Sequence, residues 1–204
     1  MARYTGPKMR LMRREGVDLG LKSYLKASIG KRLTVPPGMH GQKGKRKTSS
    51  YGVQLREKQK VRVMYGLGER QFVRFFNLAS KTKGATGELF LQLLERRLDN
   101  VLYRLGFAPT RAAARQFVNH GHVKVDEKRV SIPSFIVEPG MIVSLYERAL
   151  KIPSLTATAE VTKDGDTPAW LEKKGMVGKI KGLPTREDIA TEIDESLIVE
   201  YYSR

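Results

Sequence analysis

The segment 90–125 constrains the fold of this chain most strongly. The spacing of its apolar residues predicts two helices followed by a β-strand. Its first apolar residues recur at a spacing that places them on one face of a single helix over 88–105: Phe90, Leu94, Leu98, Val101 and Leu105. We expect Gly106 to end this helix and the Thr110 hydroxyl to cap a second one. From Val123 onward, apolar and polar residues alternate, which indicates a strand.

The alternating period continues through three further segments, so a small, mostly antiparallel sheet is predicted. These segments carry the following apolar residues: Val130 and Ile132; Phe135 and Val137; Met141, Val143 and Leu145. Residues 153–182 are poorly patterned and predict no element. Residues 192–202 fit a strand, because of their β-branched run, or a helix capped by Asp194.

The part of the chain before this segment is predicted to be an extended basic arm followed by helices. Residues 1–50 lack a sustained apolar period and are interrupted by Gly and Pro, so we expect at most one short helix, near Lys8–Glu15. Residues 51–65 are helix-like, and residues 69–80 resume the pattern after a Gly-Leu-Gly break. The fold class is therefore α+β, with a mainly helical first domain.

The charge of the chain predicts a polyanionic partner. The net charge is +17, from 38 Lys and Arg against 21 Asp and Glu. Residues 1–62 carry +14, residues 63–182 carry +7, and residues 183–204 carry −4. No apolar run approaches the ~18 residues of a membrane-spanning helix, and no signal peptide pattern opens the chain, so we expect a cytoplasmic protein without a membrane partner.

Nucleic acid is the polyanion that the second predicted helix favours. Arg111 and Arg115 stand four residues apart and share a face, which makes a cationic surface suited to folded RNA. The alternative is an ordinary helical hairpin whose basic face is only solvated. Arg97 and Arg104 flank the apolar stripe, and we expect at least one of them to pair with Asp99 or Glu95 instead of RNA.

Candidate RNA contacts fall into three groups. The arm group lies on irregular backbone that can follow a phosphate path: Arg3, Lys8, Arg10, Arg13, Arg14, Lys43, Lys45, Arg46 and Lys47. The helical group includes side chains able to stack or to form hydrogen bonds: Tyr51, Arg56, Lys58, Lys60, Arg62, Tyr65, Arg70, Gln71 and Arg74. The second-domain group consists of Arg111, Arg115, Gln116, His120 and Lys124. About half of the charges on any basic helix are expected only to keep its face in solvent.

No enzyme signature is complete, so the sequence predicts no catalytic residue, cofactor, metal or small-molecule substrate. Gly38–Lys47 is rich in Gly and Lys but lacks the Gly-Lys-Ser/Thr of a nucleotide-binding loop. Asp-Gly-Asp at 164–166 resembles the start of a calcium loop, but Gly175 stands where the closing glutamate is needed. His120 and His122 have no third metal ligand nearby in the sequence. Lone Trp170 is expected to be a packing residue.

Several blocks of sequence resemble the bacterial small-subunit ribosomal protein four family, in the same order and across nearly the whole chain. The central blocks are R-L-D-N-V-L-Y-R-L-G-F-A at 97–108 and T-R-A-A-A-R-Q-F-V-N-H-G-H at 110–122. The flanking blocks are M-A-R-Y-T-G-P-K at 1–8, P-P-G-M-H-G-Q at 36–42, L-R-E-K-Q-K at 55–60, Y-G-L-G-E-R-Q-F at 65–72, L-P-T-R-E-D-I at 183–189 and L-I-V-E-Y-Y-S-R at 197–204.

The resemblance implies a domain arrangement and a role. The N-terminal arm would be 1–50, the helical domain 51–90 plus 183–204, and the inserted RNA-binding domain 91–182, with its core motif at 94–150; the C-terminal segment would be a helix. The protein would be a structural constituent of the small ribosomal subunit that binds 16S ribosomal RNA early, clamps a helix junction, nucleates assembly and contributes to translational accuracy. Small-subunit ribosomal protein five would be a neighbour.

The sequence departs from the family pattern at two places. Many relatives bind zinc through four N-terminal cysteines, but Met9 and Met12 match the first two of these positions and the chain has no cysteine, so it resembles the zinc-free form. Asp126-Glu127-Lys128 replaces the usual Asn-Gly of the first hairpin, which argues against a tight primed turn there. Two rival functions stay open at this point: an RNA-modifying or tRNA-charging enzyme, and a free regulatory protein that binds ribosomal RNA.

Overall fold

The structure is a computed structural model, and by its internal contacts the chain divides into two units. Unit 1 comprises residues 1–87 and 192–204, and unit 2 comprises residues 88–191. The residues that the structure describes are 4–22, 33–43, 47–152, 167–189 and 193–204. The predictions for Arg3, Lys45, Arg46 and 164–166 therefore lie outside the described residues.

The limits of the units differ from the predicted domain limits. Residues 183–189 belong to unit 2, where the Gln92 Nε2 donates a hydrogen bond of 3.1 Å to the carbonyl of Pro184. The family resemblance joins this segment to the C-terminal helix, which is why it was expected in the first domain. The inserted arrangement of the two domains stays a prediction.

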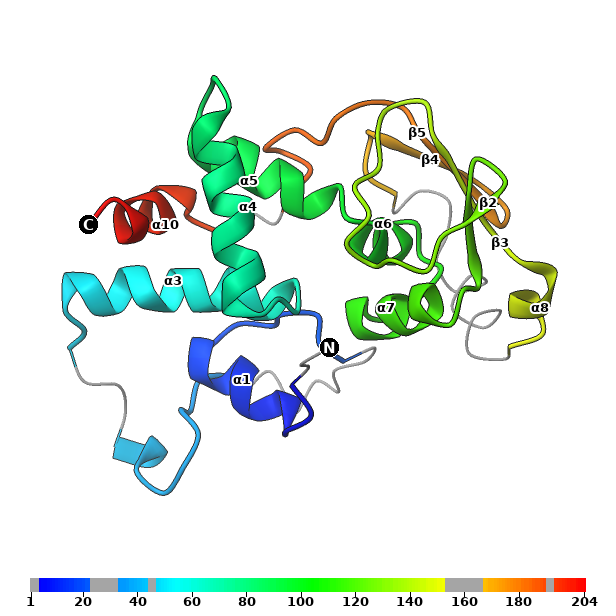
Figure 1. The fold of residues 1–204 in the computed structure, drawn as a ribbon. Helices are drawn as coiled ribbons and strands as arrows, with labels where there is room; N and C mark the ends of the chain where they lie inside the picture. The colour runs from blue at the N-terminus through cyan, green and yellow to red at the C-terminus, as the bar shows by residue number, and fades with distance from the viewer. Residues whose placement is uncertain (1–3, 23–32, 44–46, 153–166, 190–192) are drawn as a thin grey trace. The chain divides into compact units, whose positions relative to one another are not determined.

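Unit 1 is helical in its described parts, as expected (Figure 1). Its elements are α1 (Lys8–Glu15), the 3₁₀ turn η1 (Gly41–Lys43), α3 (Ser50–Met64), α4 (Glu69–Lys81) and α10 (Glu195–Tyr202). The ambiguous C-terminal run is thus a helix, and the Asp194 carboxylate accepts a hydrogen bond of 3.0 Å from the Ser196 N–H. Helix α10 packs on α3 and buries Ile198, a tertiary contact that favours helix over strand.

The described part of the arm makes contacts that the sequence pattern did not show. Met12 and Leu19 are buried in it. The Arg13 guanidinium donates hydrogen bonds to the carbonyls of Val35 and Pro36, at 2.9 and 3.0 Å. The Glu15 side chain forms an ion pair of 3.2 Å with an arginine of α3. The Arg13 hydrogen bonds therefore join two parts of the arm, and the Glu15 ion pair attaches the arm to α3.

Unit 2 consists of helices followed by a sheet. Its elements are most of α5 (Thr86–Glu95), α6 (Leu98–Arg104), α7 (Arg111–Asn119), β1 (Val123–Val125), β2 (Lys128–Arg129), β3 (Ile142–Leu145), α8 (Glu147–Leu150), β4 (Leu171–Lys174) and β5 (Val177–Ile180). The described strands form a five-stranded antiparallel sheet in the order β2-β1-β3-β5-β4.

The predicted single helix over 88–105 is wrong, because the chain leaves helical geometry between α5 and α6. Arg97 has extended backbone angles (φ −68°, ψ 137°) and forms a β-bridge with Ile136. The Leu98 N–H donates to the Phe135 carbonyl at 2.8 Å, and the Val137 N–H donates to the Arg96 carbonyl at 2.9 Å. This pairing with a distant segment interrupts the helix. The apolar residues on either side of the break keep their helical spacing, so the sequence pattern does not show it.

The predicted strands are correct in part. β1 and β3 form where they were expected, but the segments of Val130/Ile132 and Phe135/Val137 are not strands. β4 and β5 were missed, because each has only four residues, with lysines among them, and their alternation is short. Gly175, with a φ of 59°, lies between these two strands. A glycine at this place in the sequence could have indicated the turn of their hairpin.

The turn after β1 is tight, although the sequence lacks the usual Asn-Gly signal for it. Val125 pairs with Lys128, so only Asp126 and Glu127 connect β1 to β2. Their φ angles are 46° and 66°, the left-handed values that a primed two-residue turn requires at both positions. The Asp126 carboxylate also accepts a hydrogen bond of 2.9 Å from the Ile142 N–H of β3, which stabilises the turn.

The core of unit 2 lies between the sheet and helices α6 and α7. Buried side chains of both helices and of the sheet form one apolar cluster that includes Trp170, as expected for a packing residue. A Cβ at Gly178 of β5 would collide with Leu105, so α6 approaches the sheet closely there. The opposite face of the sheet exposes Ile142 and Val177.

Candidate nucleic-acid interface

The junction of α6 and α7 is built by the two local signals that the sequence displayed. Gly106 has a φ of 70° and ends α6 in the left-handed conformation. The Thr110 hydroxyl accepts a hydrogen bond of 3.2 Å from the Ala113 N–H and caps α7. Both predictions are confirmed, and the resulting turn brings the first residues of α7 against α6.

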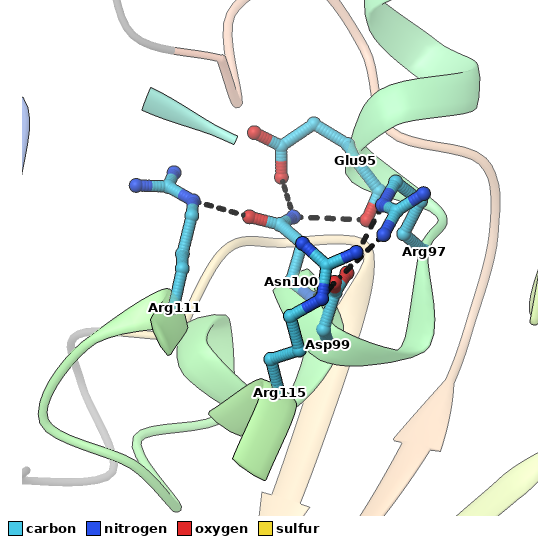
Figure 2. Close-up of polar contacts among 6 residues, drawn as sticks. All are labelled: Glu95, Arg97, Asp99, Asn100, Arg111 and Arg115. Carbon is cyan, nitrogen blue, oxygen red and sulfur yellow. Dashed lines mark hydrogen bonds and ion pairs between the residues drawn. The ribbon is translucent and has the colours of Figure 1, made fainter. Parts of the chain in front are cut away.

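Two buried carboxylates hold arginines at this junction; Figure 2 draws both carboxylates and the two arginines beside Asp99. Asp99 accepts two hydrogen bonds from the fully buried Arg97, at 3.1 and 2.7 Å, and lies 4.0 Å from the Arg115 Nε. Glu95 accepts two from Arg104, at 3.0 and 2.7 Å. The predicted pairing of Arg97 and Arg104 with acidic neighbours is confirmed for both arginines.

Asn100 links this acidic pair to the start of α7. Its Nδ2 donates to the Glu95 carbonyl at 2.9 Å and to the Glu95 Oε2 at 2.6 Å. Its Oδ1 accepts a hydrogen bond of 2.8 Å from the Arg111 Nε, and the Arg111 guanidinium carbon lies 4.5 Å from the centre of the Tyr103 ring. Asn100 could not be found from the sequence, because a single buried amide leaves no periodic signal.

The junction carries a surplus of positive charge. It holds two carboxylates and the guanidinium groups of four arginines: Arg97, Arg104, Arg111 and Arg115. Burial lowers the pKa of Arg115, an effect that Asp99 opposes and Arg97 reinforces. The carboxylates therefore reduce the mutual repulsion of the arginines without neutralising the site.

The remaining residues of the second-domain group continue from the end of α7 to the first hairpin. Gln116 and His120 are exposed, and the Lys124 Nζ lies 4.4 Å from the centre of the Tyr146 ring. Arg129 of β2, which was not predicted, donates a hydrogen bond of 3.4 Å to the His120 carbonyl. The sequence could have placed Arg129 near His120 only if the two-residue turn between β1 and β2 had been predicted.

A further set of lysines was missed together with the hairpin that carries it. The lysines of β4, β5 and the following residue are Lys173, Lys174, Lys179 and Lys181. Glu172 pairs with Lys174 at 3.1 Å and with Lys181 at 3.7 Å, and these contacts lower the pKa of the Glu172 carboxyl. The edge of the sheet is thus basic, with one acidic residue between the lysines.

The structure separates the helical group of unit 1 into interior and surface residues. The Lys58 side chain is only 5% exposed, and its Nζ donates to the Glu69 Oε1 at 2.6 Å. The same Nζ lies 4.5 Å from the centre of the Tyr201 ring. Tyr65 is 3% exposed. Because buried side chains cannot reach RNA, we leave both Lys58 and Tyr65 out of the proposed contacts.

The other members of this group lie at the surface or partly in contact with neighbours. Arg70, Arg74 and Tyr51 are exposed, and Gln71 is half-buried. Three cations take protein partners: Arg56 pairs with Glu15 at 3.2 Å, Lys60 with Glu57 at 2.8 Å, and Arg62 with Gln59 at 2.8 Å. Together with Lys58, most of the predicted cationic side chains of α3 and α4 are therefore held by intramolecular contacts.

Of the arm group, the described residues with the most exposed side chains are Arg10, Arg14, Lys43 and Lys47. Lys8 is half-buried, and the carbonyl contacts of Arg13 direct its guanidinium toward the protein. Across the described ranges, no group of three or more His, Cys, Asp or Glu could hold a metal ion. In those same ranges, no helix is both long and apolar enough to cross a membrane.

Two family descriptions match consecutive parts of the chain. Residues 3–95 match the ribosomal protein S4/S9 N-terminal domain, and residues 96–143 match the S4 domain. The second match spans the α6–α7 junction and the first hairpin. The fold and this cationic junction therefore define the class of the chain, a ribosomal protein with an S4 domain.

Full-length relatives identify the family. The small ribosomal subunit protein uS4 of Geotalea daltonii is 52% identical over 209 aligned residues, which cover 100% of both chains. The proteins of the same name from Dictyoglomus turgidum and Thermus thermophilus are 51% and 49% identical, again over 100% of both chains. The chain belongs to this family of structural, non-enzymatic ribosomal proteins, and the predicted family is confirmed.

Proposed function

We propose that this chain is a primary binder of 16S ribosomal RNA in the small subunit of the cytoplasmic ribosome. The observation that supports this most directly is the α6–α7 junction, where four arginines surround two buried carboxylates. Such a site attracts phosphate, and the guanidinium groups of Arg111 and Arg115 can bind phosphate oxygens in pairs. RNA helices are recognised mainly through shape and backbone, since A-form major grooves exclude side chains.

The proposed contact surface has one part on each unit. In unit 2 it consists of Arg111, Arg115, Gln116, His120 and Lys124, to which we add Arg129. In unit 1 it consists of half-buried Gln71 and the exposed members of the arm and helical groups: Arg10, Arg14, Lys43, Lys47, Tyr51, Arg70 and Arg74. Two basic surfaces on one chain could hold RNA helices together at a junction, and so nucleate folding of the subunit.

Two finer roles rest on the family resemblance and are proposed with it. These are an influence on translational accuracy and a contact with small-subunit ribosomal protein five. A free regulatory protein is less well supported, because the chain matches its relatives over their full length and not only over the S4 domain. Co-sedimentation with small subunits at high salt tests this difference.

The contact surface of unit 2 is tested by the salt dependence of RNA binding. We expect Arg111→Ala plus Arg115→Ala to weaken binding to 16S ribosomal RNA. The slope of log Kobs against log[salt] should fall by about two, because each phosphate that a cation neutralises contributes roughly one to that slope. The control is Arg148→Ala plus Lys151→Ala, which removes the same charge from exposed residues at α8. An unchanged slope in the first variant would count against both arginines.

A further inference from the structure

We infer that Asn100, a residue outside every predicted contact group, is a positioning residue that directs the Arg111 guanidinium toward RNA. The inference rests on the proposed function, because it assigns to Arg111 a phosphate contact. It begins from the orientation of one buried amide. Asn100 is 1% exposed, so its polar atoms depend on protein partners and not on water.

The partners of Asn100 leave its amide a single orientation. The Glu95 carbonyl and the Glu95 carboxylate both accept hydrogen bonds, so the Nδ2 must face them, at 2.9 and 2.6 Å. The Oδ1 is then directed to the other side, where it accepts from the Arg111 Nε at 2.8 Å. If the amide were rotated by half a turn, its Oδ1 would face the two acceptors of Glu95 and its Nδ2 would face the donating Nε of Arg111.

Glu95 is itself held in place, so Asn100 is anchored to a rigid group. The Glu95 side chain is buried, and both of its carboxylate oxygens accept hydrogen bonds from Arg104. A continuous chain of hydrogen bonds therefore runs from Arg104 through Glu95 and Asn100 to Arg111; Figure 2 shows its part from Glu95 onward. It connects the ends of α5 and α6 to the first residue of α7.

Contacts with Asn100 and Tyr103 restrict the plane and direction of the Arg111 guanidinium. The Nε bonds Asn100, and the guanidinium carbon lies 4.5 Å from the centre of the Tyr103 ring. Figure 2 shows the two terminal nitrogens on the side of the group away from Asn100. A guanidinium held in this way presents a fixed fork to phosphate, and it loses less conformational entropy on binding than a freely rotating side chain does.

A double-mutant cycle on 16S ribosomal RNA binding separates positioning from a merely structural role. Both Arg111→Ala and Asn100→Ala should weaken binding about tenfold, and the double variant should bind no more weakly than Arg111→Ala alone, because Asn100 acts only through Arg111. Fold-changes that multiply in the double variant would overturn the inference, as would normal binding by Asn100→Ala. Normal binding by Arg111→Ala would instead refute the proposed contact itself.

A second variant keeps the test decisive if Asn100→Ala fails to fold. Arg111→Lys keeps the charge but has no Nε to bond Asn100, so positioning predicts a loss of affinity within about threefold of that of Arg111→Ala. Arg148→Lys, at an exposed residue of α8 outside the proposed contact surface, is the control and should bind within about twofold of the wild type. Wild-type affinity in Arg111→Lys would show that charge alone suffices, and would overturn the inference.

Discussion

At the scale of single residues, the β1–β2 turn of unit 2 holds two residues in backbone conformations that their residue types disfavour. Asp126 and Glu127 have φ angles of 46° and 66°, a region in which L-residues cost about 1–2 kcal/mol and which Asn and Gly tolerate best. The turn forms nevertheless, because β1 pairs with both β2 and β3 and Asp126 binds the Ile142 N–H. Contacts in the sheet offset the local strain.

This strain predicts a stabilising substitution. Glu127→Gly should raise the free energy of unfolding by roughly 0.5 kcal/mol, because relief of the left-handed strain exceeds the added entropy of Gly in the unfolded chain. Urea unfolding followed by circular dichroism measures the change. The control, Lys128→Gly in the adjacent strand, has no positive φ to relieve and should be destabilising. A less stable Glu127→Gly protein would show that the turn is not strained.

At the scale of elements, α10 illustrates how aromatic and charged groups attach a terminal helix. The Tyr202 hydroxyl donates a hydrogen bond of 3.1 Å to Glu69, which also accepts from Lys58. Burial, followed by the Glu69 charge, raises the pKa of Tyr202. The Tyr202 ring centre lies 4.5 Å from that of Phe76. These contacts explain why Lys58 is directed inward and not toward RNA.

The apolar part of this attachment can be tested at Ile198, which is fully buried on α10. Ile198→Ala should lower the free energy of unfolding by about 2–4 kcal/mol, since it removes buried methyl groups and leaves a cavity. Ser196→Ala, at an exposed residue of the same helix, should change it by less than about 0.5 kcal/mol. Equal effects of the two substitutions in chemical denaturation would mean that α10 does not pack as described.

At the scale of the whole molecule, the net charge and the absence of cysteine together limit how the N-terminal arm can be attached. The sequence has a net charge of +17 and no cysteine, so the N-terminal arm must be fixed without a thiolate zinc site. In the described part of the arm, buried Met12 and the ion pair of Glu15 with Arg56 of α3 supply an alternative attachment. The exposed basic residues of the arm belong to the proposed RNA contact surface.

Zinc should therefore be unnecessary for folding. Treatment of the purified protein with a metal chelator should leave its thermal midpoint unchanged, and elemental analysis should find no stoichiometric zinc. A relative that retains the four N-terminal cysteines is the positive control, because its arm should lose stability in the chelator. Stoichiometric, chelator-sensitive zinc in this chain would contradict the prediction.

Much of the architecture followed from the sequence alone, because helix periods and caps are local. The helices α3, α4 and α7, the Gly106 stop, the Thr110 cap and β1 depend on residues close in the chain. Charge predicted an anionic partner for the same reason, since it sums over residues irrespective of fold. The family resemblance rests on blocks of sequence and needed no coordinates.

Only the tertiary structure decided features that depend on residues far apart in the chain. The break at Arg97 requires pairing with Ile136, and the missed β4–β5 hairpin is stabilised by pairing with β3. Burial determined which predicted cations lie inside, as Lys58 does, because a basic helix pattern does not show which lysine meets a glutamate and an aromatic ring. Asn100 acquired its role in the same way, since the hydrogen bonds of its side chain depend on the folded approach of α5, α6 and α7.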